Sequence, residues 1–437
     1  MGDLRLPLVI TPARRAAYQV LLRVFEDGAY ADRAFRGAAE GLDERERAFA
    51  QRLAYGSVQR VRTLDHAIET LGRRPVRKLD PPVRAALRLG AYQLGYTDTA
   101  THAAVNESVE LVRAARLERA VPFTNAVMRR LTDGIRALLD ALPEGPLKES
   151  YPDWIHGVFV RVLGEDGALA LMRAMNEPLE TAIRLVAGDP PPGAEATNVP
   201  GAYRVERVDE RLVAEGRVWP QSRGSQLAGL CVGAEAGERV LDLCAAPGGK
   251  TGQLRGEVTA VEIDPVRVRE LRENLVAMGR SDVMVVEADG TALPPELAGF
   301  DRALVDAPCS GLGVLAQRPD LRWRARWLEA SSAKPTTPGR GPGAPEAPEA
   351  PRRLPELQLA LLRSAAERVR PGGTIVYSVC TLNPDECEAI VDASGLRVVP
   401  LGEEWPAFAH PTRPEFLLTL PHVHGTSGFF IARLAVN

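Results

Sequence analysis

Two cysteines stand directly after apolar runs that have the character of β-strands. Cys309 lies in DAPCSG, residues 306–311, which follows the run FDRALV. Cys380 lies in YSVCTLNPDE, residues 377–386, which follows GGTIV. A cysteine thiolate is a strong nucleophile and a metal ligand, so two thiols at strand ends are candidates for chemistry.

The cysteine content argues against a structural role for these thiols. The chain has five cysteines, an odd number, and none of them forms a CxxC pair, so neither a disulfide framework nor a structural zinc site is expected. Cys231 falls in an apolar helical run and is predicted to be core, and Cys244 is predicted to be a small residue in a loop. We expect reduced thiols.

The histidines give no metal signal either. His422 and His424 form an HxH pair in PHVHGTSGFF, but no Cys or His partner lies near them in the sequence. A turn at the surface or on the substrate side is favoured over a ligand pair, so no metal is expected.

A small-residue loop follows an earlier apolar run. VLDLCAAPGGKTGQL, residues 240–254, has a pair of glycines, Gly248 and Gly249, which allow close backbone approach to a ligand. The loop lacks the GxGxxG order, and a plain tight turn stays open as an alternative. Glu262 at the end of the next strand could bind ribose hydroxyls, and Asp289 after the third strand could face an adenine. A ribose and an adenine site without a phosphate cradle suggests S-adenosylmethionine.

The elements that must position these residues fall into two patterns. Residues 11–139 have apolar residues at three-and-four spacing, which predicts an all-α domain over 1–140. Residues 216–437 alternate short β-rich runs with helices, which predicts a Rossmann-like α/β domain with a mostly parallel sheet of seven strands. Residues 141–215 contain further helical runs and a Pro/Gly-rich break, and are predicted to be a connector and RNA-binding region. The Pro/Ala/Gly tract at 331–353 is predicted to be a disordered insertion.

The net charge of −3 is unevenly distributed. Residues 1–140 hold 23 Lys and Arg against 17 Asp and Glu, and the remaining residues hold 31 against 40. The basic excess of the first third is consistent with a surface that contacts phosphates, although solvated arginines on a helical domain explain it equally well. No apolar run is long enough to cross a bilayer and no secretory signal is evident, so a cytoplasmic protein is expected.

The motifs resemble those of a known family. LDLCAAPGGKT, DAPCSGLG, RPDLRW and YSVCTLNPDE are similar to successive motifs of the RsmB (Sun/Fmu) family of RNA cytosine-C5 methyltransferases, within the NOL1/NOP2/Sun superfamily. RLAYGSVQR, LRLGAYQLGY, AAVNESVEL and FTNAVMRRL resemble the NusB-like helical domain attached to bacterial members. Together the two resemblances cover nearly the whole chain.

The resemblance implies an activity and roles for individual residues. It implies methylation of carbon 5 of a cytosine, with Cys380 as the nucleophile that adds to carbon 6 and Cys309 assisting product release. Cys309 is the rival nucleophile, because DNA cytosine methylases use the cysteine of a Pro-Cys pair. Asp306 would bind the base edge and Lys250 would lie in the active site. The cofactor S-adenosylmethionine would be held by Cys244, Ala245, Ala246, Pro247, Gly248, Gly249, Lys250, Glu262, Arg267, Asp289 and Asp306.

The resemblance also implies partners and leaves alternatives. The expected substrate is RNA, most plausibly small-subunit 16S ribosomal RNA, bound by a monomer and gripped by the helical domain. Substrate contacts are expected near Arg318, Asp320 and Trp323. Cys387 and Val379 depart from the family pattern, which usually has a polar residue and a threonine at these two positions. A transfer RNA substrate, and an RNA-binding factor whose methylase half has decayed, are the two competing hypotheses.

Overall fold

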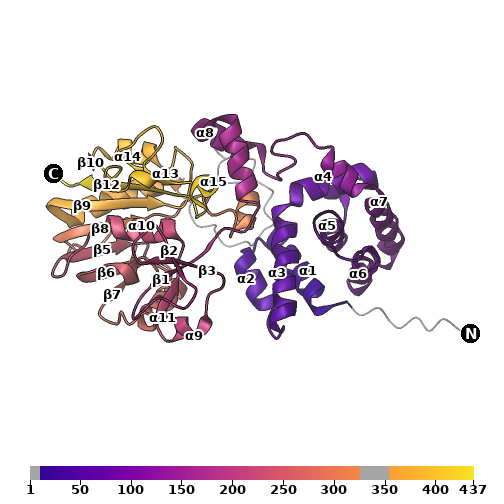
Figure 1. The fold of residues 1–437 in the computed structure, drawn as a ribbon, viewed down its shortest axis with the longest axis horizontal. Helices are drawn as coiled ribbons and strands as arrows, with labels where there is room; N and C mark the ends of the chain where they lie inside the picture. The colour runs from indigo at the N-terminus through magenta and orange to yellow at the C-terminus, as the bar shows by residue number, and fades with distance from the viewer. Residues whose placement is uncertain (1–9, 325–353) are drawn as a thin grey trace, which may run out of the picture. The chain divides into compact units, whose positions relative to one another are not determined.

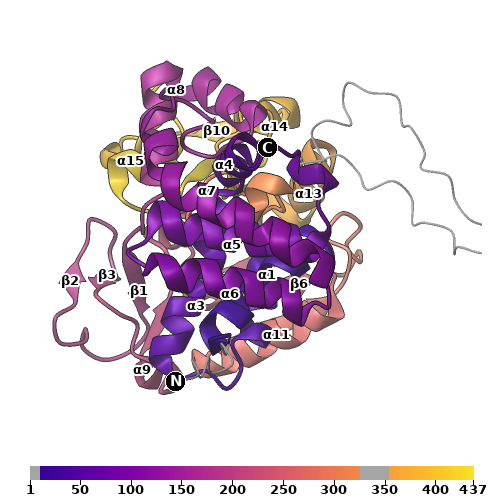
Figure 2. The ribbon, with the colours of Figure 1, turned by 90° about the vertical axis from the view of Figure 1, so that its right-hand side faces the viewer.

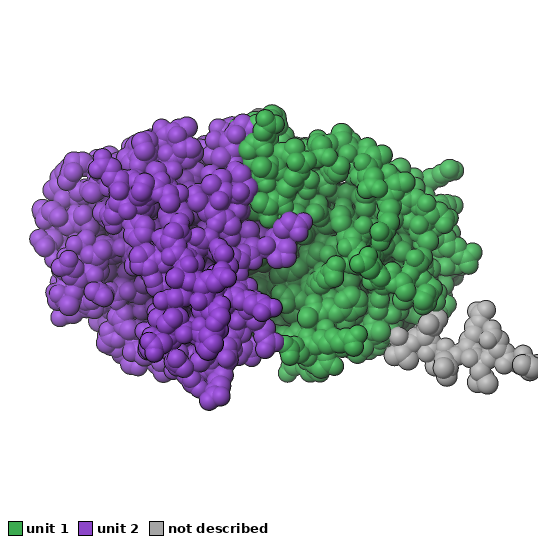
Figure 3. Space-filling view, viewed as in Figure 1, with its two compact units in different colours: residues 1–160, 165–176, 317–325 green, residues 161–164, 177–316, 326–437 purple. Residues whose placement is uncertain are grey.

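The computed structural model describes residues 10–324 and 354–437, so the Pro-rich tract at 331–353 lies outside the described residues. The chain divides into two compact units, which are coloured separately in Figure 3. The helical unit comprises residues 1–160, 165–176 and 317–325, and the α/β unit comprises residues 161–164, 177–316 and 326–437. The change of unit at 176/177 falls inside the region predicted to be a connector.

The first part of the helical unit is a bundle, as the three-and-four spacing predicts. Its α5 is buried along most of its length and packs against α1, α3, α4, α6 and α7, which surround it in Figure 1 and face the viewer in Figure 2. Asp43 caps α3 by accepting a hydrogen bond from the backbone N–H of Glu46. The bundle helices are α1 (Pro12–Phe25), α2 (Ala31–Ala38), α3 (Glu44–Gln59), α4 (Val61–Gly72), α5 (Pro81–Tyr96), α6 (Thr101–Ala114) and α7 (Val121–Asp140), with short 3₁₀ turns at Val76–Lys78 and Glu118–Ala120.

One glycine explains how closely these helices approach. A Cβ at Gly90 of α5 would lie 2.5 Å from Met128 Cε of α7 and from Ser108 Oγ of α6. Both distances are far below van der Waals contact, so only glycine lets the three helices meet at this level. The glycine of the LRLGAYQLGY run is therefore required for packing.

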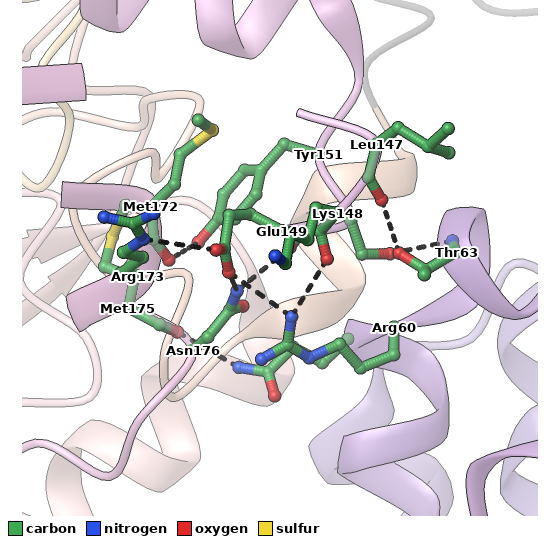
Figure 4. A network of polar contacts seen from close by, with 12 residues as sticks. Arg60, Thr63, Leu147, Lys148, Glu149, Tyr151, Met172, Arg173, Met175 and Asn176 are labelled. Atoms are coloured by element: carbon green, nitrogen blue, oxygen red, sulfur yellow. Dashed lines mark hydrogen bonds and ion pairs between the residues drawn. The ribbon is translucent and has the colours of Figure 1, made fainter. Parts of the chain in front are cut away.

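The helical unit continues through α8 (Asp153–Ala174), which is interrupted at Gly164 with φ of 71°. The residues around its ends are tied to α3 and α4 by the polar network in Figure 4. Asn176 Nδ2 donates to the carbonyl of Glu149 (2.9 Å) and to its carboxylate (2.9 Å), and Thr63 Oγ1 donates to the carbonyl of Leu147 (2.6 Å). The Tyr151 hydroxyl donates to the carbonyl of Met172 at 3.1 Å.

The segment RPDLRW also belongs to the helical unit, where Pro319–Trp323 forms a 3₁₀ turn. Arg322 is fully buried, and its guanidinium lies 3.8 Å from the centre of the Tyr151 ring. It donates to the carbonyls of Gln59 (3.3 Å), Ser150 (3.4 Å) and Met175 (3.2 Å). Arg322 therefore anchors this segment in the interior of the helical unit.

The α/β unit begins with a small antiparallel sheet in the order β2-β3-β1-β4. Its strands are β1 (Thr181–Leu185), β2 (Glu195–Ala196), β3 (Ala202–Val205) and β4 (Val218–Pro220), and α9 (Glu210–Ala214) precedes the last of them. Most of this sheet falls in the region predicted to be a connector, for which no strands were predicted. The strands are two to five residues long and lie among Pro and Gly, so their period-two pattern is too short to detect.

The main sheet has the order β10-β12-β9-β8-β5-β6-β7, which Figure 1 shows, and β11 pairs with β12. The pairs among β9, β8, β5, β6 and β7 are parallel, and the pairs of β12 are antiparallel, which confirms the predicted mostly parallel sheet. The described residues give this sheet eight strands where seven were predicted, because the three-residue β11 is too short to detect in the sequence. The strands are β5 (Arg239–Leu243), β6 (Glu257–Glu262), β7 (Met284–Glu287), β8 (Phe300–Asp306), β9 (Val369–Val379), β10 (Arg397–Val399), β11 (Leu417–Thr419) and β12 (Phe429–Ala435).

Helices cover this sheet. α11 packs on β6 and β7, α13 packs on β5, β8 and β9, and α10 packs on β9 and β12. None of the helices in the described ranges combines the length and the apolar character needed to span a membrane. The helices of this unit are α10 (Arg223–Cys231), α11 (Pro265–Ala277), α13 (Leu354–Arg368), α14 (Glu388–Ser394) and α15 (Pro421–His424), with 3₁₀ turns at Thr251–Gln253 and Pro406–Phe408.

Candidate active site

The two motif cysteines lie side by side beyond the carboxyl ends of β8 and β9. These strands are parallel neighbours, and their register pairs Asp306 with Ser378. Cys309 follows β8 by three residues and Cys380 follows β9 directly, so the register brings the two loops together. The Sγ atoms of Cys309 and Cys380 are 3.4 Å apart. The carboxyl edge of parallel strands is where α/β folds place their chemistry.

The pKa values of the two thiols are shifted in opposite directions. The hydrogen bond from Cys309 lowers the pKa of Cys380 below its ordinary value, and the nearby Lys250 ammonium adds to this against the effects of burial and of Asp306. The hydrogen bond to Cys380, and then burial, raise the pKa of Cys309 well above its ordinary value. Cys380 is therefore the better thiolate and Cys309 the thiol that donates to it.

An ion pair lies beside the thiols. Lys250 Nζ donates to Asp306 Oδ2 at 2.7 Å, and the Ser378 hydroxyl donates to Asp306 Oδ1 at 2.6 Å. The Lys250 ammonium also lies 4.8 Å from the centre of the Phe429 ring, a cation–π distance. Side-chain exposure is 12% for Lys250 and 31% for Asp306, so the carboxylate is fixed by its partners but open to a ligand on one side.

The loop after β5 brings Lys250 to this place. Cys244 has φ of 62°, and Gly248 has φ of 104° in a position where a Cβ would lie 2.8 Å from Leu271 Cδ1. The buried carboxyl of Asp242 accepts a hydrogen bond from the Thr251 hydroxyl at 2.6 Å, which closes the loop. Burial raises the pKa of Asp242 to about 7. This tight turn explains why the run AAPGG consists of small residues.

The acid at the end of β6 is buried and presents a polar edge to the same loop. Glu262 Oε1 accepts from the backbone N–H of Ile263 (3.0 Å) and of Asp264 (3.2 Å). Its Oε2 accepts no hydrogen bond from the residues that the structure describes, but it forms an ion pair with Arg267 Nη1 at 3.1 Å. Arg267 Nη2 donates to the carbonyl of Ala246 at 2.5 Å. The side chain of Ile263 is 61% exposed beside this acid. A buried acceptor next to an exposed apolar side chain fits a nucleoside.

The remaining predicted cofactor residues lie around this loop. Ala245 donates its N–H to the carbonyl of Val261 at 3.0 Å, and the carbonyl of Pro247 accepts from Asn274 Nδ2 at 2.8 Å. Gly249 lies close to Trp219, because a Cβ there would be 3.3 Å from its indole nitrogen. Asp289, two residues beyond β7, accepts from the N–H and the hydroxyl of Thr291, both at 2.8 Å. The described residues show no hydrogen bond between Asp289 and Glu262.

The other cysteines and the histidine pair are not part of the pair of thiols at Cys309 and Cys380. Cys231 is buried in α10 as predicted, and burial raises the pKa of Cys231, Cys244 and Cys387. His424 Nδ1 accepts from the N–H of Leu420 at 2.8 Å, and its Nε2 lies 2.9 Å from the carbonyl of Ala407. Across residues 10–324 and 354–437, no three His, Cys, Asp or Glu side chains gather as metal ligands.

The substrate contacts expected near RPDLRW stay a prediction, and the structure shows what holds this segment. Asp320 is fully buried and pairs with Arg324 at 3.1 Å, and the indole of Trp323 donates to the carbonyl of Val58 at 2.7 Å. Both residues hold the segment inside the helical unit. Burial of charged side chains cannot be read from the sequence, where they are typical of a surface.

Several residues around the site were missed. Ser378 fixes Asp306, Phe429 lies under Lys250, and Ile263 lies beside Glu262. Ser378 has a signal in the sequence, since it lies near the end of the strand that leads into Cys380. Phe429 and Ile263 carry no such signal, because apolar residues in strands are usually core.

Comparison with known proteins gives two family matches. Residues 11–133 match the NusB family, and residues 230–332 and 346–435 match the family described as 16S rRNA methyltransferase RsmB/F. A Synechocystis protein described as a probable ribosomal RNA small subunit methyltransferase B is 31% identical over 97% of this chain and 99% of its own length. The ribosomal RNA small subunit methyltransferase B of Klebsiella pneumoniae strain 342 is 28% identical over 96% of this chain and 97% of its own.

Solved structures share the fold. The crystal structure of the protein PH0851 covers 98% of this chain and 99% of its own, with a TM-score of 0.77 and 23% sequence identity. At this identity the likeness shows the fold. The full-length sequence relatives, the two family matches and the order of the motifs agree. The chain therefore belongs to the RsmB/F family of 16S ribosomal RNA methyltransferases and carries a NusB-family helical region at its N-terminal end.

Proposed function

We propose that this protein methylates carbon 5 of a cytosine in 16S ribosomal RNA, through a covalent bond between Cys380 and carbon 6 of the base. The observation that carries the proposal is the pair of sulfurs 3.4 Å apart beside the Lys250–Asp306 ion pair. The names of the relatives support ribosomal RNA of the small subunit as the substrate.

Cys380 is the nucleophile in this proposal. Carbon 5 of cytosine is a weak nucleophile until a thiolate adds to carbon 6 and the ring becomes an enamine. The Cys380 thiolate forms the S–C6 bond, and the displaced electron pair moves through the ring toward nitrogen 3. The lowered pKa of Cys380 supports this assignment over Cys309, because only the thiolate attacks.

Asp306, held in place by Lys250, binds the target cytosine in this proposal. A carboxylate can accept a hydrogen bond from the exocyclic amine of cytosine, which uracil lacks, and so selects the base. The partly exposed Asp306, fixed by Lys250 and Ser378, is suited to this contact and to holding a proton near nitrogen 3 as the adduct forms.

Cys309 assists the release of the product. Once carbon 5 carries the methyl group, its proton leaves to a base, the S–C6 bond breaks, and Cys380 leaves as a thiolate. A sulfur 3.4 Å from Cys380 is close enough to act on this step. The raised pKa of Cys309 makes it a poor first nucleophile.

S-adenosylmethionine supplies the methyl group when bound. Glu262 would accept from the ribose hydroxyls, Ile263 would lie against the purine, and Asp289 would face the adenine edge. The loop from Cys244 to Lys250 would contact the amino-acid part. The buried Glu262 oxygen without a hydrogen bond supports this placement.

The NusB-family region, residues 11–133, is proposed to grip the RNA. Its basic excess supports a contact with phosphates, and the target cytosine must leave its stack to reach the thiols. If its substrate is ribosomal RNA, the protein acts in the cytoplasm.

Mass spectrometry of the protein mixed with S-adenosylmethionine and RNA containing 5-fluorocytosine tests this proposal. Fluorine at carbon 5 cannot leave as a proton, so the wild-type protein should accumulate a covalent complex, and Cys380→Ala should form none. With natural RNA, Cys309→Ala should accumulate the adduct that the wild type resolves. A complex that persists in Cys380→Ala and disappears in Cys309→Ala would reverse the two roles.

A further inference from the structure

A buried polar cluster lies behind the two thiols. It consists of Ser310, Gln358, Thr381, Asn383 and Glu386, which we call the Glu386 cluster. Gln358 and Thr381 are completely buried, and Asn383 and Glu386 are 1% exposed. Its members come from the loop after β8, from α13 and from the loop after β9. Such groups are costly to bury unless they are hydrogen-bonded, so their arrangement is informative.

The Glu386 carboxylate joins the three segments. Its Oε2 accepts from the backbone N–H of Ser310 at 2.8 Å and from Gln358 Nε2 at 3.0 Å. Its Oε1 accepts from Asn383 Nδ2 at 3.2 Å. A carboxylate can accept all three bonds at once, which an amide of the same shape cannot do.

The cluster holds the chain on both sides of Cys309. Gln358 Nε2 also donates to the carbonyl of Pro308 at 2.8 Å, and the hydroxyls of Ser310 and Thr381 are 2.8 Å apart. Pro308 and Ser310 precede and follow Cys309, and Thr381 follows Cys380. The two thiols therefore lie on two loops that are hydrogen-bonded to each other through the residues next to the cysteines.

The charge of Glu386 acts on one thiol more than on the other. In the described part of the chain, no cation forms an ion pair with Glu386. The pKa of Cys309 is raised first by its hydrogen bond to Cys380 and by burial, and Glu386 adds to this effect by electrostatic repulsion of a thiolate. Glu386 is not among the main causes of the shift in the pKa of Cys380.

We propose that Glu386 is a positioning residue that gives the two thiols their different roles: it fixes the Cys309 loop against the Cys380 loop and keeps the proton on Cys309. A protonated Cys309 can donate to the Cys380 sulfur and leaves Cys380 as the single attacking thiolate. This inference rests on the proposed function of the two cysteines and adds a residue that does not touch the substrate.

Alkylation of the protein without RNA or cofactor tests the inference. Iodoacetamide at pH 8, followed by peptide mass spectrometry, measures the reactivity of each thiol. In the wild type, Cys380 should react and Cys309 should stay unmodified. In Glu386→Gln, alkylation of Cys309 should rise about tenfold, because the repulsion of a Cys309 thiolate is removed and its loop is no longer held. With RNA, kcat should fall about tenfold, and KM for S-adenosylmethionine should stay the same.

Three further variants separate charge, geometry and folding. Asp385→Asn removes an exposed carboxylate one residue away, whose ion pair is with Arg161, and should change neither thiol. Gln358→Met loosens the Cys309 loop but keeps the Glu386 charge, so kcat should fall while Cys309 stays unreactive. Glu386→Asp keeps the charge on a shorter side chain and should behave like Gln358→Met, which provides the test if Glu386→Gln does not fold.

Two results would overturn the inference. The first is a folded Glu386→Gln protein in which Cys309 remains as unreactive as in the wild type. The second is equal activation of Cys309 by Gln358→Met and Glu386→Gln, which would show that looseness alone exposes the thiol. Absence of methylation by the wild type would contradict the proposed function instead, and the alkylation result would stand by itself.

Discussion

The Sγ atoms of Cys309 and Cys380 lie 3.4 Å apart, although 71 residues separate the two in the sequence. Their closeness follows from the parallel pairing of β8 with β9, which places Asp306 opposite Ser378. Since each thiol changes the proton affinity of the other, the two behave as one unit.

The first prediction concerns the proton on Cys380. The hydrogen bond from Cys309 is the main cause of the lowered pKa of Cys380, so Cys309→Ala should raise that pKa. The pH profile of Cys380 alkylation by iodoacetamide should therefore move to higher pH. Cys231→Ala, a core thiol in α10, is the control and should leave the profile in place. An unchanged profile in Cys309→Ala would show that the two sulfurs do not share a hydrogen bond in solution.

Much of this site could be predicted from the sequence, because its parts sit at ends of regular elements. Cys309, Cys380 and Lys250 follow strands and Glu262 ends one. The apolar runs of these strands are easy to detect, and parallel strands end at one edge. The mostly parallel sheet and the helical bundle follow from the same periodicity.

Other features could not be predicted, for physical reasons. The strands of the β2-β3-β1-β4 sheet are too short for alternation to show, and residues of the Pro/Gly-rich stretch pair only through tertiary contacts. Gln358 lies on a helix 28 residues from Glu386, and its amide resembles any exposed glutamine until the fold buries it. Arg322 reads as a surface residue for the same reason.

The second prediction concerns Lys250. Its ammonium fixes Asp306 and adds to the lowering of the pKa of Cys380 that the Cys309 hydrogen bond begins. Lys250→Gln should therefore reduce the rate of methyl transfer about 100-fold in single-turnover measurements. Lys148→Gln removes a lysine that pairs with Glu144 in the helical unit and should keep the wild-type rate. A Lys250→Gln rate within about twofold of the wild type would refute the role of the ion pair.

The third prediction concerns stability and pH. Burial raises the pKa of Asp242 from the ordinary value of 3.8 to about 7, so the folded protein holds a proton that the unfolded chain releases between these values. The stability contributed by the neutral carboxyl is complete below about pH 4 and is lost as the pH rises to about 7. Asp242→Asn cannot ionise, so its Tm relative to the wild type should increase between pH 5 and pH 8 in thermal unfolding.

A second aspartate serves as the control for this measurement. The backbone N–H of Arg239, followed by Arg370, lowers the pKa of Asp301, so its titration lies below pH 4. The Tm difference between Asp301→Asn and the wild type should stay constant from pH 5 to pH 8. A constant difference for Asp242→Asn as well would mean that Asp242 is ionised throughout this range.

The fourth prediction concerns Arg322. Its guanidinium donates to three backbone carbonyls and stacks on Tyr151 in the interior of the helical unit. Arg322→Met keeps most of the volume but removes the guanidinium donor from the carbonyls of Gln59 and Ser150, while the carbonyl of Met175 keeps its hydrogen bond from Gln59 Nε2. This loss should cost about 3 kcal/mol of the free energy of unfolding. Urea denaturation followed by circular dichroism measures this cost. Arg45→Met, at an exposed position of α3, should cost less than about 0.5 kcal/mol. Equal midpoints for the two variants would contradict the anchoring role.

The pairing of β8 with β9 also bears on how such a chain can evolve. The ladder from Arg302–Thr374 to Asp306–Ser378 sets the spacing of the reactive sulfurs, so the number of residues joining the strands does not enter into it. The entropy of closing a longer connection grows only with the logarithm of its length. The length of that connection can therefore change by insertion or deletion without moving the two sulfurs. Related proteins can differ in this length and keep the same reaction centre.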